Sequence, residues 1–406
     1  MVNIAVLGYG TVGSGVVEVL NTNRELIDLR AGEEIRVKYV LDLRDFPGDP
    51  IQEKVVHDFD TILNDPEVSI VVEVMGGLKP AYDFTKAALL KGKSVCSSNK
   101  ELVASHGVEF LEIAKEKQVN YLFEASCGGG IPIIRALNES LTPEDVIEVS
   151  GILNGTTNFI LTEMRDKGAD FEDVLKEAQD LGYAERNPEA DVEGHDACRK
   201  VAILSSIAFG KTVKYQDIYT EGISHITLQD MEYAKELNMA IKLLANGYSL
   251  PEGGDVSYYA MVAPFLVRHD HPLYSVDGVF NAIFVRGNTL GDTMFYGSGA
   301  GSLPTASAVV GDVISAARNA GKTLPCFWKG EKLTLSSNDK AVRQFFIRVG
   351  EDRAEEAKNI FRAERLVRSE RVTGEVGLIT GMLSEKEFAD KAESFGGVLQ
   401  RIRINQ

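Results

Sequence analysis

The chain opens with an apolar run, a glycine turn and a second apolar run, reading Asn3-Ile-Ala-Val-Leu-Gly-Tyr-Gly-Thr-Val-Gly-Ser-Gly-Val-Val-Glu-Val-Leu20. A short apolar run of this kind is typical of a strand buried on both faces of a parallel sheet. Gly8, Gly10 and Gly13 follow the spacing of the dinucleotide fingerprint, in which a strand precedes the turn and a helix follows it. The stretch therefore predicts a turn whose free amides face phosphate groups.

The residues that follow repeat this alternation of strand and helix. Such an alternation predicts a doubly wound α/β sheet, that is, a Rossmann-type nucleotide domain, over residues 1–130. The expected strands are 37–43, 70–75, 94–98 and 121–124, and helical patterns at 81–90 and 108–116 separate the later ones.

The pattern changes after the glycine cluster at 128–130. Longer strands at 256–267 and 278–285 alternate with helices near 171–181 and 195–209 without one-for-one interleaving. This pattern favours a mixed α+β domain over residues 131–300, with helices on one face of its sheet. We expect this domain to carry catalysis and to form the contact between subunits.

Two further segments complete the predicted organisation. A glycine turn and an apolar helix within 301–328 are expected to return to the first domain. Residues 339–406 hold 13 basic and 12 acidic side chains, whereas the whole chain has a net charge of −17, so the tail is a compositionally separate module. Its pattern predicts the ferredoxin-like order βαββαβ.

Composition narrows the classes of function. Apolar residues make up 44% of the 406 residues and charged residues 25%, as in an ordinary globular protein. The net charge of −17 disfavours nucleic acid and anionic membranes as partners. The longest apolar stretch, Val201 to Phe209, is shorter than the ~20 residues that a membrane span needs. With no secretory signal and four widely spaced cysteines, we expect a cytoplasmic protein with reduced thiols.

The end of the second predicted strand offers two candidate contacts to the ribose of a dinucleotide. Asp42 could accept hydrogen bonds from the ribose hydroxyls, and the fork of Arg44 suits a 2′-phosphate. The alternative is that both are solvated turn residues. We expect NADP as the cofactor, with NAD tolerated.

The densest chemical signal lies between Gly182 and Lys200. Asp196 and Lys200 are four residues apart on a predicted helix, a spacing that is often only a surface ion pair. The uncharged residues that follow indicate that this helix is buried, so the lysine would sit at the edge of a cavity and could exchange a proton with a substrate oxygen. Glu185 and Asp191 lie on the preceding loop, where they could receive an ammonium or hydroxyl group or simply be solvated. Lys100 follows another predicted strand, on the crevice side of the sheet.

Together these segments resemble homoserine dehydrogenase. The resemblance covers residues 1 to about 320 and implies interconversion of L-aspartate 4-semialdehyde and L-homoserine with a nicotinamide cofactor, within threonine, methionine and isoleucine biosynthesis. It rests on the opening fingerprint and on segments 97–104, 124–132, 151–160, 182–200 and 299–307.

The resemblance also implies roles for individual residues. Lys200 would donate the proton to the aldehyde oxygen, with Lys100 close to the reacting centre. Glu185, Asp191 and Asp196 would bind substrate or hold Lys200, and a homodimer or homotetramer is expected. The implied cofactor contacts are Gly8, Gly10, Thr11, Val12, Gly13, Arg44, Lys100, Gly182 and Gly301, and a structural sodium ion would lie at Glu124, Cys127, Gly129 and Ile131.

Two departures and two rival functions accompany this resemblance. Asn187 stands where an aspartate is common, which removes one loop charge. The tail resembles an ACT module, the small βαββαβ unit that binds amino acids, but its loop at 350–354 lacks the usual Pro-Gly, so threonine binding there is doubtful. The rival functions are a non-catalytic nucleotide and amino-acid sensor, and another amino-acid dehydrogenase.

Overall fold

The computed structural model describes residues 1–405, which form two compact units. Unit 1 comprises residues 1–144, 202–214 and 295–333, and unit 2 comprises residues 145–201, 215–294 and 334–406. Within residues 1–405, none of the helices combines the length and the hydropathy needed to cross a bilayer.

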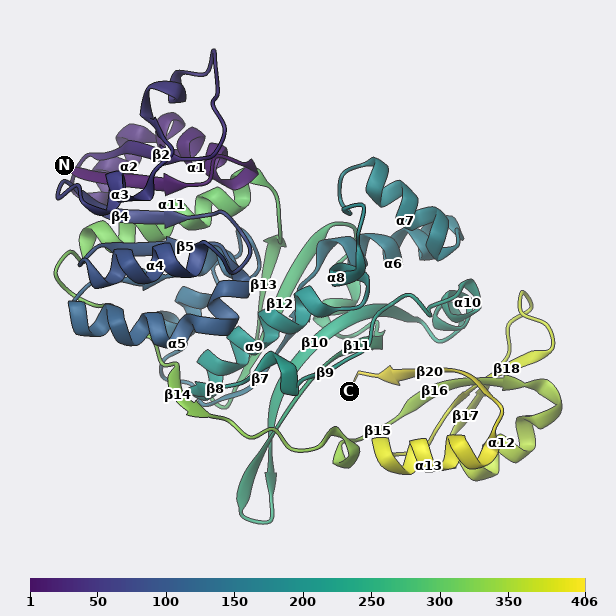
Figure 1. The fold of residues 1–406 in the computed structure, drawn as a ribbon. Coiled ribbons are helices and arrows are strands. Elements are labelled where there is room, and N and C mark those ends of the chain that lie inside the picture. Colours follow the sequence, from purple (N-terminus) through teal and green to yellow (C-terminus); the bar gives the residue numbers. More distant parts are fainter. Residues whose placement is uncertain (406) are drawn as a thin grey trace. The chain divides into compact units, whose positions relative to one another are not determined.

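Unit 1 is built on a sheet whose strand order is β3-β2-β1-β4-β5-β6, with every pair parallel. This is the order of a doubly wound dinucleotide fold, as the sequence predicted, and Figure 1 shows helices packed along this sheet. The strands are β1 (Val2–Leu7), β2 (Ile35–Leu41), β3 (Val55–Val56), β4 (Val68–Glu73), β5 (Ser94–Ser97) and β6 (Tyr121–Leu122). The helices are α1 (Thr11–Thr22), α2 (Arg24–Ala31), α3 (Phe59–Leu63), α4 (Ala81–Leu90), α5 (Lys100–Lys117) and α11 (Ser302–Arg318).

Helix α11 is distant in sequence but belongs to the core of unit 1. Its Val309 and Val313 are fully buried in one apolar cluster with Val16 of α1 and Val6 of β1. In Figure 1 the helix, drawn in green, lies beside the purple and blue elements that begin the chain. Two short strands of the same unit, β8 (Lys211–Thr212) and β14 (Lys329–Lys332), pair in parallel.

Unit 2 is built on a mixed sheet with the order β13-β12-β7-β10-β11-β20-β16-β18-β17, and β9 also pairs with β11. Its longest pairing joins β10 and β11, which are antiparallel over their whole length. The elements before the tail are β7 (Val146–Ile152), α6 (Gly155–Lys167), α7 (Phe171–Asp180), α8 (Glu189–Val192), α9 (His195–Phe209), β9 (Tyr219–Thr220), α10 (Leu228–Glu236), β10 (Met239–Glu252), β11 (Asp255–Arg268), β12 (Phe280–Gly287) and β13 (Gly291–Ser298). Two of them are divided between the units, because α9 after Val201 and β13 after Met294 belong to unit 1.

The tail has the predicted βαββαβ order, with a core of stacked and tilted rings at Phe345, Phe361 and Phe388. It is not detached from the rest of unit 2, because β20 pairs in parallel with β11 and so continues the same sheet. Its elements are β15 (Val342–Arg343), β16 (Phe345–Gly350), α12 (Ala354–Ile360), β17 (Arg365–Val367), β18 (Glu375–Ile379), β19 (Leu383–Ser384), α13 (Glu385–Phe395) and β20 (Val398–Ile404).

Buried ion pairs reinforce this attachment of the tail. The Arg403 guanidinium of β20 donates to both carboxylate oxygens of Glu385, at 2.6 and 3.0 Å. The same side chain also donates to Glu221, at 2.7 Å, just after β9. Bidentate pairs between arginine and a carboxylate fix geometry as well as charge, so these contacts set the register of the tail on the sheet.

Candidate active site

The glycine turn of unit 1 has the backbone geometry of a phosphate-binding loop. Gly8 has a φ of +96°, a value that favours glycine. A Cβ added at Gly13 would overlap the Gly8 carbonyl oxygen, so this position requires glycine as well. Helix α1 begins at Thr11 without a side-chain hydrogen bond to its first amides. The positive end of α1 therefore lies at the end of β1, where an anion would be bound.

Asp42 and Arg44 lie beside this turn and form one ion pair. Asp42 accepts a hydrogen bond from the Tyr9 amide at 2.8 Å, and Arg44 Nε and Nη2 donate to its two carboxylate oxygens at 3.0 Å each. The Arg44 guanidinium holds the pKa of Asp42 well below its usual range. Because 62% of the Arg44 side chain is exposed whereas Asp42 is engaged with the turn, the arginine is the more accessible of the two.

Lys100 is the first residue of α5, directly after the end of β5. Asn99 caps this helix by accepting from the Leu102 amide at 3.1 Å, and its own side-chain amide donates to the Gly77 carbonyl. At the end of β5, the Ser97 hydroxyl donates to the fully buried Glu73 at 2.6 Å, and burial raises the pKa of Glu73. Glu73 and Asn99 were not singled out by the sequence analysis, yet they fix the backbone that carries Lys100.

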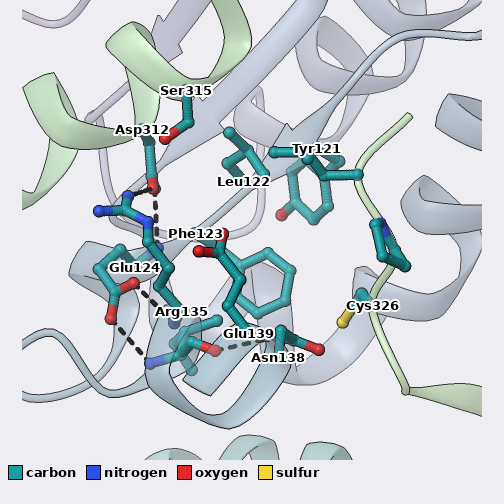
Figure 2. A pocket seen from close by; sticks show the side chains of 13 residues that line it. Tyr121, Leu122, Phe123, Glu124, Arg135, Asn138, Glu139, Asp312, Ser315 and Cys326 are labelled. Atoms are coloured by element: carbon teal, nitrogen blue, oxygen red, sulfur yellow. Dashed lines mark hydrogen bonds and ion pairs between the residues drawn. The ribbon is translucent and has the colours of Figure 1, made fainter. Parts of the chain in front are cut away.

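Glu124 anchors the segment that the family resemblance connects with sodium. Its two carboxylate oxygens accept from the amides of Ile134 and Arg135, at 2.7 and 2.8 Å. Asp312 of α11 accepts from the Glu124 amide and from the Arg135 guanidinium, at 2.8 Å each. Figure 2 shows these three charged side chains converging on one small cavity. Burial and the neighbouring Glu124 carboxylate raise the pKa of Asp312 to about 7.

The loop that follows Glu124 carries backbone carbonyl oxygens, which are ligand atoms suited to a hard cation. Gly128 and Gly129 both have positive φ, which turns successive carbonyl groups of the loop. A Cβ at Gly129 would lie 2.5 Å from the backbone of Gly299, so this turn is tightly enclosed. Carbonyl oxygens are the ligand type that hard cations prefer. No group of three or more His, Cys, Asp or Glu side chains able to hold a metal occurs among residues 1–405.

Lys200 of α9 is buried in a polar cluster of unit 2. Its ammonium donates to Asp196 Oδ2 and to the Leu153 carbonyl, both at 2.7 Å, and its side chain is 10% exposed. Gly194, with a φ of +80°, leads into α9 and packs against Thr220 and Val262. The pair that the sequence placed four residues apart is therefore a buried ion pair, and the alternative of a surface pair is wrong.

Asn154 joins this cluster and was not assigned from the sequence. Its side-chain amide donates to Asp191 Oδ1 at 2.7 Å and to Asp196 Oδ2 at 2.9 Å. Its side-chain oxygen accepts from the Thr157 amide, so the same residue caps α6. One amide thus holds two of the predicted acids together at the start of a helix. An Asn-Gly-Thr-Thr sequence before an apolar run is a helix-cap signal, which could have drawn attention to it.

The remaining predicted positions lie at turns. Glu185 is exposed on the loop after α7, and its carbonyl accepts from the Gln179 side chain at 3.1 Å. The neighbouring Tyr183 packs its ring on Phe159 of α6. Gly182 has a φ of +76° in the same loop, and Gly301 has a φ of +110° directly before α11 in unit 1. The structure thus brings Asp191, Asp196 and Lys200 together and leaves Glu185 on an exposed loop.

Family models, sequence relatives and solved structures all match this chain to homoserine dehydrogenases. The family model described as homoserine dehydrogenase matches residues 132–314, and that of its NAD-binding domain matches residues 8–124. Homoserine dehydrogenase of Helicobacter pylori is 41% identical, over 86% of this chain and 81% of its own. The crystal structure of a homoserine dehydrogenase from Thiobacillus denitrificans has a TM-score of 0.92 at 37% identity, covering 100% of this chain and 98% of that one.

A more distant solved structure carries a cofactor. It is described as a hyperthermophilic archaeal homoserine dehydrogenase in complex with NADPH, with a TM-score of 0.66 and 29% identity over 78% of this chain and 97% of that one. Together with the nucleotide turn of unit 1, these matches exclude a non-catalytic sensor. The chain belongs to the homoserine dehydrogenase family of NAD(P)-dependent oxidoreductases, which interconvert L-homoserine and L-aspartate 4-semialdehyde.

Proposed function

We propose that Lys200 is the proton donor when this chain reduces L-aspartate 4-semialdehyde to L-homoserine with NADPH. One observation carries the proposal: the Lys200 ammonium is buried beside Asp196 and the Leu153 carbonyl, 2.7 Å from each. A buried ammonium held by a carboxylate and a carbonyl keeps its orientation, which suits a group that must deliver a proton at one place.

The proton step balances the arrival of a hydride. When bound, NADPH would provide the hydride that adds to the aldehyde carbon, and the carbonyl oxygen would then take on negative charge. Lys200 donates an N–H proton to that oxygen and is then protonated again from solvent. In the reverse direction the neutral amine takes the hydroxyl proton of L-homoserine. Asp196 accepts from Lys200 throughout, so it positions the amine in both directions.

The other predicted residues divide into substrate and cofactor contacts. Asp191 and Glu185 are acids that precede Lys200 in the same segment of the chain, and we assign them to the substrate ammonium. The Asn154 bridge between Asp191 and Asp196 supports a common orientation of these acids. We assign Lys100 to the vicinity of the nicotinamide and of the reacting carbon, because it follows the end of a parallel strand of the nucleotide sheet.

We assign the preferred cofactor as NADP, with NAD accepted. Gly8, Gly10, Thr11, Val12 and Gly13 would hold the pyrophosphate, and Gly182 and Gly301 would be further contacts. The exposed guanidinium of Arg44 supports recognition of a 2′-phosphate.

The cofactor assignment is tested on one arginine. Arg44→Ala should raise the KM for NADPH about tenfold, the equivalent of one charge-assisted hydrogen bond, and leave the KM for NADH within about twofold. Arg30, on the last turn of α2, offers a surface arginine for a control substitution to alanine. Equal changes in both KM values for Arg44→Ala would assign this residue to the turn rather than to the phosphate.

Three further assignments complete the proposal. We assign a structural sodium ion to a position near the Glu124 carboxylate, held by the backbone carbonyls at Cys127, Gly129 and Ile131. Residues 1–130 with 301–328 would bind the nucleotide, residues 131–300 would carry catalysis and the subunit contact, and residues 339–406 would form an ACT-like module. We place the protein in the cytoplasm as a homodimer or homotetramer, without nucleic-acid or membrane partners.

The activity itself has a direct assay. Purified protein mixed with L-aspartate 4-semialdehyde and NADPH should consume NADPH, seen as a fall in its near-ultraviolet absorbance, and L-homoserine should accumulate in equal amount. Consumption of NADPH with other amino aldehydes but not with this one would indicate a different amino-acid dehydrogenase.

A further inference from the structure

A second polar cavity lies in unit 2, lined by residues that take no part in the Lys200 cluster. Its volume is 240 Å³. One wall is a row across three strands of the sheet, in which Glu148 of β7 faces Tyr248 of β10 on one side and Arg286 of β12 on the other. Residues directly opposite each other in antiparallel strands project from the same face of a sheet. The row therefore presents a carboxylate, a phenol and a guanidinium side by side.

The tail supplies the opposite wall, through Arg343 of β15. Its Nη2 donates to the Tyr248 hydroxyl at 3.2 Å, and its guanidinium lies over the Phe265 ring at 5.6 Å. The residue is 7% exposed, and burial lowers the pKa of its guanidinium. Its Nη1 donates to Met261 Sδ at 3.6 Å. Its Nε lies 3.3 Å from Glu385 and has no hydrogen-bond partner in the described part of the chain. This buried cation is incompletely satisfied by the protein.

The sheet side of the cavity carries one buried acceptor without a donor, at Asn246, and one carboxylate, at Glu148. Asn246, two residues before Tyr248 in β10, is 7% exposed, and its side-chain oxygen has no hydrogen-bond donor among residues 1–405. Glu148 accepts from Ser150 at 2.7 Å and lies 3.5 Å from Arg286, and burial raises its pKa. Buried polar atoms without partners are rare in folded proteins and call for an explanation.

The two sides of the cavity define the class of ligand. A donor in need of an acceptor lies at Arg343, an acceptor in need of a donor lies at Asn246, and a carboxylate lies at Glu148. The lining also holds Arg286, so a simple cation would face two guanidinium groups, and a simple anion would face the Glu148 carboxylate. The volume is below the roughly 300–1,000 Å³ of pockets for drug-sized molecules, and Leu250 and Val342 add apolar surface. A small zwitterion with a short uncharged side chain satisfies all of these conditions.

We propose that this cavity binds a free α-amino acid, with its carboxylate at Arg343 and its ammonium at Glu148 and Asn246. The site joins the catalytic sheet to the tail, because Glu148 and Asn246 belong to β7 and β10 whereas Arg343 precedes β16. It differs from the loop at 350–354, where the tail's resemblance to an amino-acid-binding module would place a ligand. The proposal does not depend on the role of Lys200.

Calorimetry on the full chain tests the proposal without measuring activity. The probes are L-alanine, L-valine, L-threonine and L-methionine, with butyrate and n-butylamine as molecules that carry only one of the two charges. L-Homoserine is left out because it is the substrate. At least one amino acid should bind, and neither butyrate nor n-butylamine should bind at the same concentration.

Variants locate the binding. Glu148→Gln and Asn246→Leu should each weaken it at least tenfold, and Glu148 is partly exposed, so its variant keeps the fold testable. Asp352→Ala, in the loop at 350–354, should leave the affinity within twofold. The proposal is overturned if none of the amino acids binds, if binding survives both sheet variants, or if binding is lost in Asp352→Ala instead.

Discussion

Lys200 and Lys242 are both buried lysines of unit 2, but their surroundings differ. Lys200 is on a helix, with its carboxylate partner four residues earlier and a side chain that is 10% exposed. Lys242 is in β10 and 1% exposed. Its ammonium donates to Asn158, to the Val276 carbonyl and to Asp277, at 3.3, 2.5 and 2.8 Å. These acceptors use all three hydrogens of an ammonium, so Lys242 ties the sheet to the 276–280 loop.

The comparison shows that burial does not by itself identify a lysine that takes part in the reaction. Burial lowers the pKa of Lys242, yet its three acceptors show that this residue has a structural role. The two lysines are linked through one helix, because Asn154 caps α6 next to the Lys200 cluster and Asn158 contacts Lys242 one turn later. What distinguishes Lys200 is the set of acids held around it. Each of the following substitutions tests this distinction.

Lys200→Ala should have the largest effect. Loss of a positioned proton donor lowers kcat by roughly 10²–10⁴-fold. The affinity for NADPH should stay within about twofold of wild type, since the nucleotide turn is in unit 1. Steady-state rates and a fluorescence titration with NADPH measure the two quantities. Weak NADPH binding combined with a normal kcat would place this lysine in the cofactor site instead.

Lys242→Met should show the reverse pattern. The buried Asn158 oxygen and Val276 carbonyl lose their donor, which costs about 1–3 kcal/mol of unfolding free energy. Urea denaturation measures this loss, and kcat per folded molecule should stay within about twofold. If kcat falls as far as in Lys200→Ala, the assignment of Lys200 to catalysis and of Lys242 to stability is wrong.

Asn154→Ala and Asn158→Ala form a matched pair on α6. Asn154→Ala removes the bridge between Asp191 and Asp196 and should lower kcat about tenfold, with a cap loss of about 1 kcal/mol. Asn158 donates to three carbonyls of the 276–280 loop, so Asn158→Ala should lower stability while leaving kcat nearly unchanged. Similar kcat values for the two variants would contradict a role for Asn154 in orienting the acids.

The Glu124, Arg135 and Asp312 cluster of unit 1 should show a pH dependence of stability. The pKa of Asp312 is raised to about 7 from an ordinary value of about 3.8, so the folded state binds more protons than the unfolded state between these values. The stabilisation that comes from the protonated Asp312 is fully present below about pH 3.8 and is lost as the pH rises toward 7. The stability advantage of wild type over Asp312→Asn should therefore shrink between pH 5 and pH 8, by on the order of 1 kcal/mol. An advantage that grows over this range would refute the assignment.

Much of the fold could be predicted because its signals are local. The spacing of apolar residues located α4 and α9 with their observed ends, and the three glycines of the opening turn located α1. Errors occurred at ends that local contacts decide. The strand predicted at 37–43 spans Ile35–Leu41, because Asp42 leaves the strand to accept from the Tyr9 amide and from Arg44. The pairing of β20 with β11 joins segments over a hundred residues apart, and no periodicity reveals it.

The candidate site also has residues that the sequence indicated and partners that only the structure shows. Asp196 and Lys200 were visible because helical spacing brings residues four apart onto one side. The Leu153 carbonyl has no side-chain signature, and Asn154 reaches Asp196 from 42 residues away. Exposure of Glu185 likewise depends on how the loop after α7 packs, which its composition does not specify. Residue types thus indicated the chemistry, and the partners that orient them required the structure.

The central claim is that Lys200 provides the proton, and chemical rescue tests it most directly. The measurement is the single-turnover rate of NADPH oxidation by Lys200→Ala with saturating L-aspartate 4-semialdehyde, at increasing concentrations of ethylammonium. The proton-donor role predicts a rate that is at least a hundredfold below wild type without the amine and rises as ethylammonium fills the space of the missing side chain. A variant that keeps more than a tenth of the wild-type rate with no amine present would contradict it.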